Sequence, residues 1–231
     1  MSNTGRGNRI LEKPKELKQL SDAMMFICLF AVISWFVATG KAAEFNGSVM
    51  QTAYSLRQSW LNPVMIGITY LASPPFIIGA IVLLLIIPAT RKQIGLPLGI
   101  VQLVTFGIYK LLKASFAIPR PDPTMWLVQE TGYAFPSGHS MNGLIFYWML
   151  VYLIRKNYSG KWVDAVTVIF TVLPFIIALT RVYVGVHWLT DIAGGLCFGI
   201  ACVTFVRVAM DTVIYAYRDE PKNLRDGNKA A

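Results

Sequence analysis

The sequence predicts an all-α, polytopic membrane protein with six transmembrane helices and both termini in the cytoplasm. Three observations carry this prediction. The chain of 231 residues is 55% hydrophobic and only 14% charged, with a mean hydropathy of +0.53, which is too apolar for a soluble domain of this length. Its apolar residues form runs that approach the roughly 20 residues needed to span a membrane. Its basic residues lie in the short connections between those runs.

The predicted spans follow one another along most of the chain. They cover residues 21–40, 63–89, 94–116, 139–154, 163–180 and 187–210. Pro74-Pro75 interrupts the second span and predicts a short interfacial helix before a spanning helix, because proline removes a backbone donor and crowds the preceding turn. Residues 41–62 are predicted to form an amphipathic interfacial helix or a loop, with Tyr54 and Trp60 suited to the headgroup region.

Positive charge predicts the orientation of these spans. With the N-terminus inside, 15 of the 21 Lys and Arg residues fall on the cytoplasmic side. The resulting organisation is a basic cytoplasmic tail (1–20), a membrane domain (21–211) and a polar cytoplasmic tail (212–231). The outer segments hold the other basic residues, which are Lys41, Arg57, Lys110, Lys113, Arg120 and Arg181.

Three other classes of structure or partner fit the sequence less well. The first apolar run precedes small residues, as in a cleavable signal peptide, but it exceeds the usual apolar core of about 7 to 15 residues, so we expect a membrane anchor. Cys28, Cys197 and Cys202 lie in apolar runs and are odd in number, which argues against a disulfide framework. The basic residues form no stripe with interleaved aromatics, so no nucleic-acid partner is expected.

Both histidines of the chain belong to one three-part pattern. Its segments are Lys113-x6-Arg120-Pro121, Pro136-Ser137-Gly138-His139 and Thr180-Arg181-x5-His187-x3-Asp191. His187 and Asp191 are four residues apart at the start of a predicted helix, so both project from one face. Asp191 can then accept a hydrogen bond from one ring nitrogen and leave the other as an oriented lone pair.

Three cations accompany the histidines. Residues 182–186 are just long enough to turn the chain back into the membrane, which places Arg181 beside His187. Lys113 ends the third span, and Arg120 lies in the following outer loop, held extended by flanking prolines. Arginine suits bidentate contact with phosphate oxygens and lysine supplies a point charge, so this group predicts a phosphoryl-binding site.

The middle segment predicts further anion contacts at a helix N-terminus. Ser137 can cap the helix, free backbone amides there bind anions, and Gly138 lets the backbone approach a phosphate oxygen. His139 follows where it can protonate a leaving oxygen. With two histidines and cysteines in apolar runs, a zinc site lacks ligands, and Asp122 and Glu130 are too scattered for a two-metal site. We therefore expect neither metal nor cofactor.

In order and spacing, the three segments resemble the signature of the type 2 phosphatidic acid phosphatase superfamily, whose membrane branch dephosphorylates lipid phosphates and diphosphates. The match covers residues 113–191, about a third of the chain; the third segment usually begins Ser-Arg, whereas here it begins Thr180-Arg181. The resemblance implies metal-free catalysis in which His187 becomes a phosphohistidine, oriented by Asp191. His139 would protonate the leaving oxygen and then activate water. The phosphoryl oxygens would be held by Lys113, Arg120, Ser137, Gly138 and Arg181.

The resemblance thus predicts a lipid phosphatase of the bacterial cytoplasmic membrane, with its active site on the outer face. Its substrate would be undecaprenyl diphosphate, phosphatidylglycerophosphate or phosphatidic acid, and the motif distinguishes neither the tail nor the oligomeric state. A lipid phosphotransferase would use the same residues. An anion transporter is disfavoured, because the spans carry few charges and no internal repeat is visible.

Overall fold

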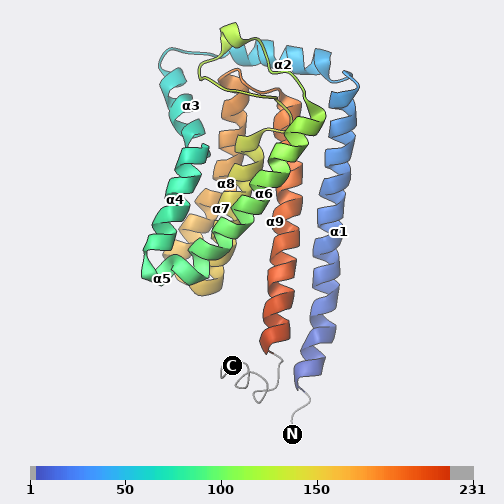
Figure 1. Ribbon diagram of the computed structural model, residues 1–231, viewed down its shortest axis with the longest axis vertical. Helices are drawn as coiled ribbons and strands as arrows, with labels where there is room; N and C mark the ends of the chain where they lie inside the picture. The colour runs from blue at the N-terminus through green and yellow to red at the C-terminus, as the bar shows by residue number, and fades with distance from the viewer. Residues whose placement is uncertain (1–3, 219–231) are drawn as a thin grey trace.

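The computed structural model describes residues 4–218, with side chains described for residues 16–212. All regular elements in this part of the chain are helical (Figure 1). In chain order they are α1 (Thr4–Ala38), α2 (Ala43–Ser55), α3 (Leu61–Tyr70), α4 (Pro74–Ile86), α5 (Pro88–Thr90), a π-helical turn (Arg91–Gly95), α6 (Leu96–Phe116), a 3-10 turn (Pro123–Met125), α7 (Gly138–Asn157), α8 (Lys161–Tyr183) and α9 (Leu189–Arg218).

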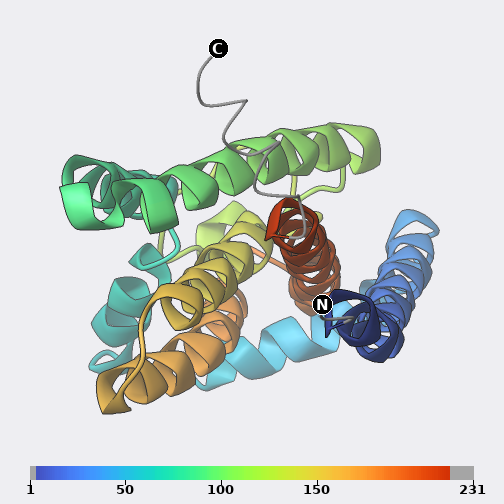
Figure 2. The ribbon, with the colours of Figure 1, turned by 90° about the horizontal axis from the view of Figure 1, so that it is seen from below.

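Helix α7 forms the centre of the bundle. Seen along the bundle axis it lies between α6, α8 and α9, and α1 packs against the far side of α9 (Figure 2). Most α7 side chains are buried by these neighbours. The close approach of α7 and α9 depends on Gly195, since a Cβ there would lie 2.8 Å from the carbonyl oxygen of Ser137. Packing of α7 against α9 therefore fixes the first turn of α7.

The coarser part of the predicted fold class is confirmed, because the chain is an all-α, multi-pass membrane bundle; the six spans and the cytoplasmic termini stay predictions. Four segments are long and apolar enough to cross a membrane, namely Glu16–Ala38, Pro88–Phe116, Lys161–Tyr183 and Leu189–Thr212; the bent pair α3 and α4 raises the number to five in the described residues. Large apolar side chains such as Leu111, Val168 and Leu179 are exposed on the outer faces, as lipid contact requires. The remaining predicted span, 139–154, corresponds to α7. This helix is long enough to cross a membrane but carries polar residues at both ends.

The Pro74-Pro75 break is confirmed. Helices α3 and α4 meet at a bend of 47°. The Ser73 hydroxyl caps α4 by accepting from the amide of Phe76 at 3.4 Å, and Pro74 occupies the first helical position, where a missing N–H costs nothing. The segment predicted as interfacial helix or loop forms α2, which lies across one end of the bundle (Figure 1).

Several helix boundaries differ from the prediction. Helix α1 begins at Thr4, so most of the basic segment predicted as a tail continues the first spanning helix. The last span was predicted from His187, but α9 begins at Leu189, and Asp191 accepts from the amide of Trp188 at 2.8 Å, which closes the first turn there. The helix runs on to Arg218; residues 219–231 of the predicted polar tail lie outside the described residues.

Candidate functional site

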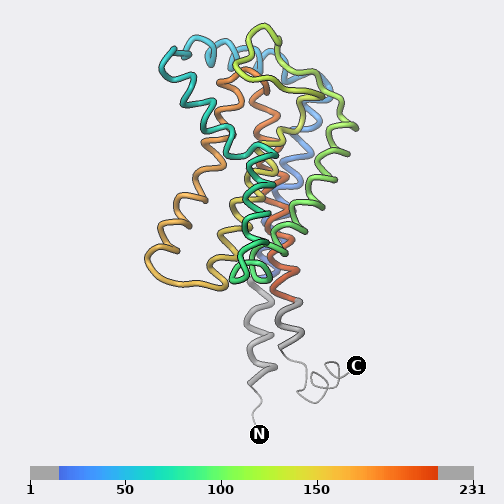
Figure 3. The backbone as a smooth tube through the Cα atoms, turned by 60° about the vertical axis from the view of Figure 1, so that its left-hand side comes forward, coloured from blue at the N-terminus to red at the C-terminus, as the bar shows by residue number. Residues whose placement is uncertain are grey.

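The three sequence segments meet at the end of the bundle covered by α2. The connection between α6 and α7 folds over this end beside the turn between α8 and α9 (Figure 3). Two backbone bonds fix the connection: Leu127 donates to the carbonyl of Val184 at 2.9 Å, and Ala134 donates to that of Ile118 at 2.7 Å. The indole of Trp188 donates to the carbonyl of Pro119 at 3.0 Å. Arg120 therefore sits on a tethered segment rather than a free loop.

His187 lies in the turn just before α9, with its side chain fully enclosed. Its Nδ1 is 3.1 Å from Oδ2 of Asp191, and its Nε2 is 3.1 Å from Nη1 of Arg120. A guanidinium can only donate, so Nε2 must be the acceptor and Nδ1 must carry the proton given to Asp191. The hydrogen-bond network thus assigns the tautomer that the i, i+4 spacing predicts, although His187 itself precedes the helix.

The charge environment keeps His187 neutral. The residue lies in the connection between two spanning helices, and burial lowers its pKa well below the ordinary value. The positive charges of Arg120, Arg181 and Lys113 lower the pKa further. All three cations identified in the sequence therefore lower the pKa of this imidazole and favour its neutral form.

Arg120 uses all five of its N–H donors. Carbonyl oxygens accept three of them: Gly132 from Nε at 3.0 Å, Val186 from Nη1 at 2.9 Å and Thr131 from Nη2 at 3.0 Å. The remaining two contact His187 and Oε2 of Glu130, the latter at 3.4 Å. The carbonyls fix the guanidinium plane, and the other two donors point into the site.

Arg181 lies in the last turn of α8 and is buried. Its Nη1 donates to the hydroxyl of Thr69, on α3, at 2.7 Å, and its Nη2 pairs with Oε1 of Glu130. Its Nε has no hydrogen-bond partner within the described part of the chain. One donor of this buried guanidinium is thus available to a ligand.

Glu130 is the main site residue that sequence reasoning missed, because it was considered only as a cation ligand. Its carboxylate bridges Arg120 and Arg181, the two arginines predicted to hold phosphate. Thr69 was missed as well: it lies 112 residues from Arg181 in the chain, and no spacing rule connects them. An acidic residue shortly before the Ser-Gly-His segment was the available signal for Glu130.

The start of α7 joins the site through its backbone. Ser137 accepts from the amide of Ser140 at 3.4 Å as a helix cap, and its own amide donates to the carbonyl of Asp191 at 3.0 Å. A Cβ on Gly138 would lie 2.7 Å from the ring of Tyr109, so the glycine is required by this packing. Lys113 is buried with Nζ 5.2 Å from the centre of the same ring, and no ion pair or hydrogen bond of its side chain occurs in the described residues.

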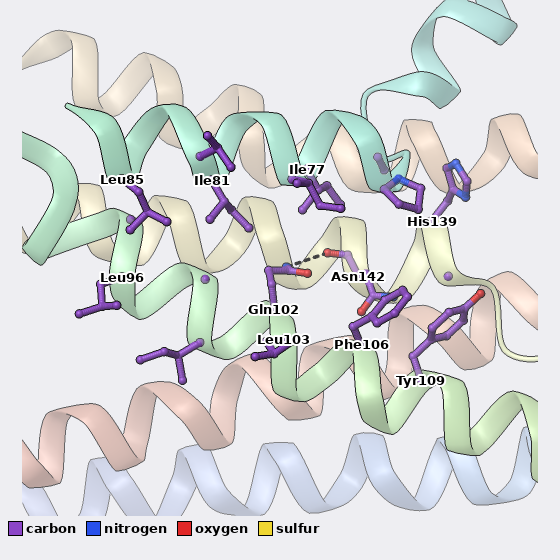
Figure 4. A pocket seen from close by; sticks show the side chains of 18 of the residues that line it. Ile77, Ile81, Leu85, Leu96, Gln102, Leu103, Phe106, Tyr109, His139 and Asn142 are labelled. Carbon is purple, nitrogen blue, oxygen red and sulfur yellow. Dashed lines mark hydrogen bonds between the residues drawn. The ribbon is translucent and has the colours of Figure 1, made fainter.

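A cavity of about 660 Å³ leads from the site down the bundle between α4 and α6 (Figure 4). Apolar side chains such as Ile77, Ile81 and Leu103 line it, and His139 and His187 lie at its upper end with Arg120 and Glu130. A second cavity of about 260 Å³ lies on the α3 side and shares His139 and Glu130 with the first; Arg181 lines it. Lys113, Ser137 and Asp191 line neither cavity.

Within the residues that the structure describes, no group of three or more His, Cys, Asp or Glu side chains is arranged to hold a metal ion. The polar groups around the cavity end are instead two imidazoles, two guanidiniums and one carboxylate. This arrangement combines an imidazole with an oriented ring nitrogen, a second imidazole and donors that can bind an anion.

A multi-pass membrane fold with a cationic histidine site at the end of an apolar cavity defines a membrane lipid phosphate phosphatase. The sequence pattern of the PAP2 superfamily matches residues 94–215, and the chain belongs to this superfamily.

Similar proteins agree with this assignment. The chain is 32% identical to phosphatidylglycerophosphatase B of Bacillus subtilis over 201 residues, which cover 83% of this chain and 95% of that one. It is 29% identical to undecaprenyl-diphosphatase of Sulfolobus acidocaldarius, over 81% of this chain and 90% of the relative. The crystal structure of a transmembrane PAP2-type phosphatidylglycerolphosphate phosphatase from Bacillus subtilis superimposes with a TM-score of 0.76 at 29% identity, over 83% of this chain and 97% of that one.

Proposed function

We propose that this enzyme hydrolyses the terminal phosphate of a lipid phosphate or diphosphate through a phosphohistidine on His187, without a metal ion. One observation carries the proposal. Nε2 of His187, the unprotonated ring nitrogen in the tautomer fixed by Asp191, belongs to a side chain that lines an apolar cavity among cations, with Arg120 as its present hydrogen-bond donor. That combination suits attack on a phosphate attached to a hydrocarbon tail.

The steps follow from the roles of the two histidines. Nε2 of His187 attacks phosphorus and forms the N–P bond, while the P–O bond to the lipid breaks and His139 gives its proton to the departing oxygen. The Nδ1–H of His187 stays bonded to Asp191, which stabilises the positive charge on the ring. His139 then takes a proton from water, and the water oxygen displaces His187 from phosphorus to release inorganic phosphate.

Cations and a helix N-terminus hold the phosphoryl oxygens. Arg120 and Arg181 supply directed donors, and Lys113 adds positive charge from behind the cavity wall. The amide of Gly138, in the first turn that Ser137 caps, adds a backbone contact. Together these groups stabilise the charge that spreads over the phosphoryl oxygens in the transition state.

The proposed location is a bacterial cytoplasmic membrane with the site on the outer face. Helices α1, α6, α7, α8 and α9 and the bent pair α3–α4 would make six spans. An even number of spans would leave 1–20 and 212–231 on the same side of the membrane, and the distribution of Lys and Arg favours the cytoplasmic side. The candidate substrates are undecaprenyl diphosphate, phosphatidylglycerophosphate and phosphatidic acid, and the names of the relatives support the first two.

Phosphate release in detergent with EDTA tests this function. We expect inorganic phosphate from at least one of the three lipids at an unchanged rate after EDTA treatment, since no step needs a metal. Loss of activity with EDTA, restored by a divalent cation, would contradict the mechanism. Accumulation of a phosphorylated acceptor lipid instead of inorganic phosphate would identify the alternative, a lipid phosphotransferase that uses the same site.

The Glu130 carboxylate pairs with N–H donors of Arg120 and Arg181 that a bound phosphate would use. We expect Glu130→Gln to tighten binding of inorganic phosphate about 10-fold, because a carboxylate no longer competes for the two arginines. Inhibition of phosphate release by added inorganic phosphate measures this. Asp164→Asn, which neutralises an exposed acid paired with Arg155, is the matched control and should change nothing. Weaker phosphate binding in Glu130→Gln would mean that Glu130 positions the arginines instead of competing for them.

A further inference from the structure

Two carboxamide side chains interrupt the apolar lining of the large cavity. Gln102 projects from α6 and Asn142 from α7, and the two lie side by side in the cavity lining near His139 (Figure 4). Each is only 7% exposed. Their neighbours in the lining include Ile77, Ile81 and Leu103, and neither amide hydrogen-bonds a charged side chain in the described residues.

The hydrogen-bonding capacity of the pair is largely unused. Gln102 Nε2 donates to the backbone carbonyl of Asn142 at 3.1 Å. The Oδ1 of Asn142 is buried without a hydrogen-bond partner among the described residues. A carboxamide offers two donors and an accepting oxygen, and rotation of the amide interchanges their positions. A buried amide left unpaired is costly, which favours a ligand that completes it.

The position of the pair matches one part of a lipid phosphate. Asn142 follows His139 by three residues, so it lies roughly 4.5 Å further along the axis of α7. His139 is the proposed proton donor to the leaving oxygen. In a glycerol-based lipid phosphate, the group three or four bonds beyond that oxygen is an ester carbonyl or a hydroxyl. In a polyprenyl diphosphate the inner phosphate adjoins the leaving oxygen, and the atoms at the depth of Asn142 are hydrocarbon.

We propose that Gln102 and Asn142 form a subsite for the ester or hydroxyl groups of a glycerol-based lipid phosphate, and that this subsite favours such lipids over polyprenyl diphosphates. An ester carbonyl would accept from one of the amide N–H groups, and a hydroxyl would donate to Asn142 Oδ1. The inference rests on the proposed phosphatase function and names the substrate class of that site.

The test compares two phosphate monoesters in the full chain in detergent. Dioctanoyl phosphatidic acid carries ester groups at the required depth, and its di-ether analogue lacks the carbonyls but has the same tails. We expect the wild-type protein to prefer the ester in kcat/KM, and we expect Asn142→Leu and Gln102→Leu to lower the ester-to-ether ratio roughly 3- to 10-fold, the size of one or two lost hydrogen bonds. Thr105→Val is the matched control, since Thr105 is buried on α6 outside the cavity lining and bonds its own helix at Val101; its ratio should equal that of the wild type.

Each outcome bears on a separate claim. A wild-type ratio near one, or a ratio that survives either folded leucine variant, would overturn the subsite. An equal loss on both substrates would also overturn it, because that result marks a contact that only packs α6 on α7. If a leucine variant fails to fold, two wild-type measurements still decide the proposal. They are the ester-to-ether ratio of kcat/KM and the rate on farnesyl diphosphate, which we expect to be lower than the rate on the ester lipid. Absence of phosphate release from every lipid in the wild type would instead refute the proposed function.

Discussion

We expect replacement of His187 with alanine to lower the rate of phosphate release by at least about 10⁴-fold, because the proposed covalent intermediate forms on its Nε2. The residue makes two side-chain contacts, with Asp191 and Arg120, and its ring fills an enclosed position. Alanine leaves the cations and the cavity in place. The loss should therefore appear in kcat, measured with dioctanoyl phosphatidic acid in detergent and EDTA.

A folding control separates lost chemistry from lost structure. Thermal unfolding of the variant should remain cooperative. Because an inactive variant gives no inhibition constant, binding of inorganic phosphate is measured directly by calorimetry. This measurement shows whether Arg120 and Arg181 still form the phosphate site. We expect binding within a few-fold of the wild type. Turnover by a folded His187→Ala protein at a rate similar to the wild type would show that the nucleophile has been assigned to the wrong residue.

Replacing His139 with alanine should affect two substrates differently. For an alkyl phosphate the loss should reach about 10² to 10⁴-fold, because the departing alkoxide needs a proton. For p-nitrophenyl phosphate the first step should be nearly unaffected, since nitrophenolate leaves without protonation. Hydrolysis of the phosphohistidine still requires activation of water, so the variant should release a burst of nitrophenol equal to the enzyme concentration and then turn over slowly.

Stopped-flow absorbance measures this burst. The wild-type protein, in which water attack is assisted by His139, serves as the reference and should show a smaller burst or none. An equal loss on both substrates with no burst would contradict the assignment, and would make His139 a residue that shapes the cavity end, where it lines both cavities.

Much of the site follows from local sequence rules. His187 and Asp191 are joined by a spacing that one turn of helix imposes, and the sequence predicts their contact even though α9 begins two residues later than expected. The connection between Arg181 and His187 is only five residues long, so backbone geometry also keeps this arginine near the histidine. Side chains separated by few residues are constrained by backbone geometry alone.

Other features depend on tertiary packing and leave no local signal. Glu130, in the connection between α6 and α7, meets Arg181 across 51 residues, and Gln102 on α6 meets Asn142 on α7 across 40, because tertiary packing brings distant segments together. The polar residues of α7 also depend on tertiary packing: neighbouring helices bury this helix, so it tolerates polar residues that a lipid-exposed helix could not.

Capture of the covalent intermediate tests the central claim most directly. The His139→Ala protein is mixed with p-nitrophenyl phosphate, quenched at high pH, where phosphohistidine survives, and digested for mass spectrometry. We expect one added phosphoryl group on His187 and none in the double variant that carries both His139→Ala and His187→Ala. A phosphoryl group on another residue, or none in a protein that shows the burst, would contradict a phosphohistidine mechanism at this site.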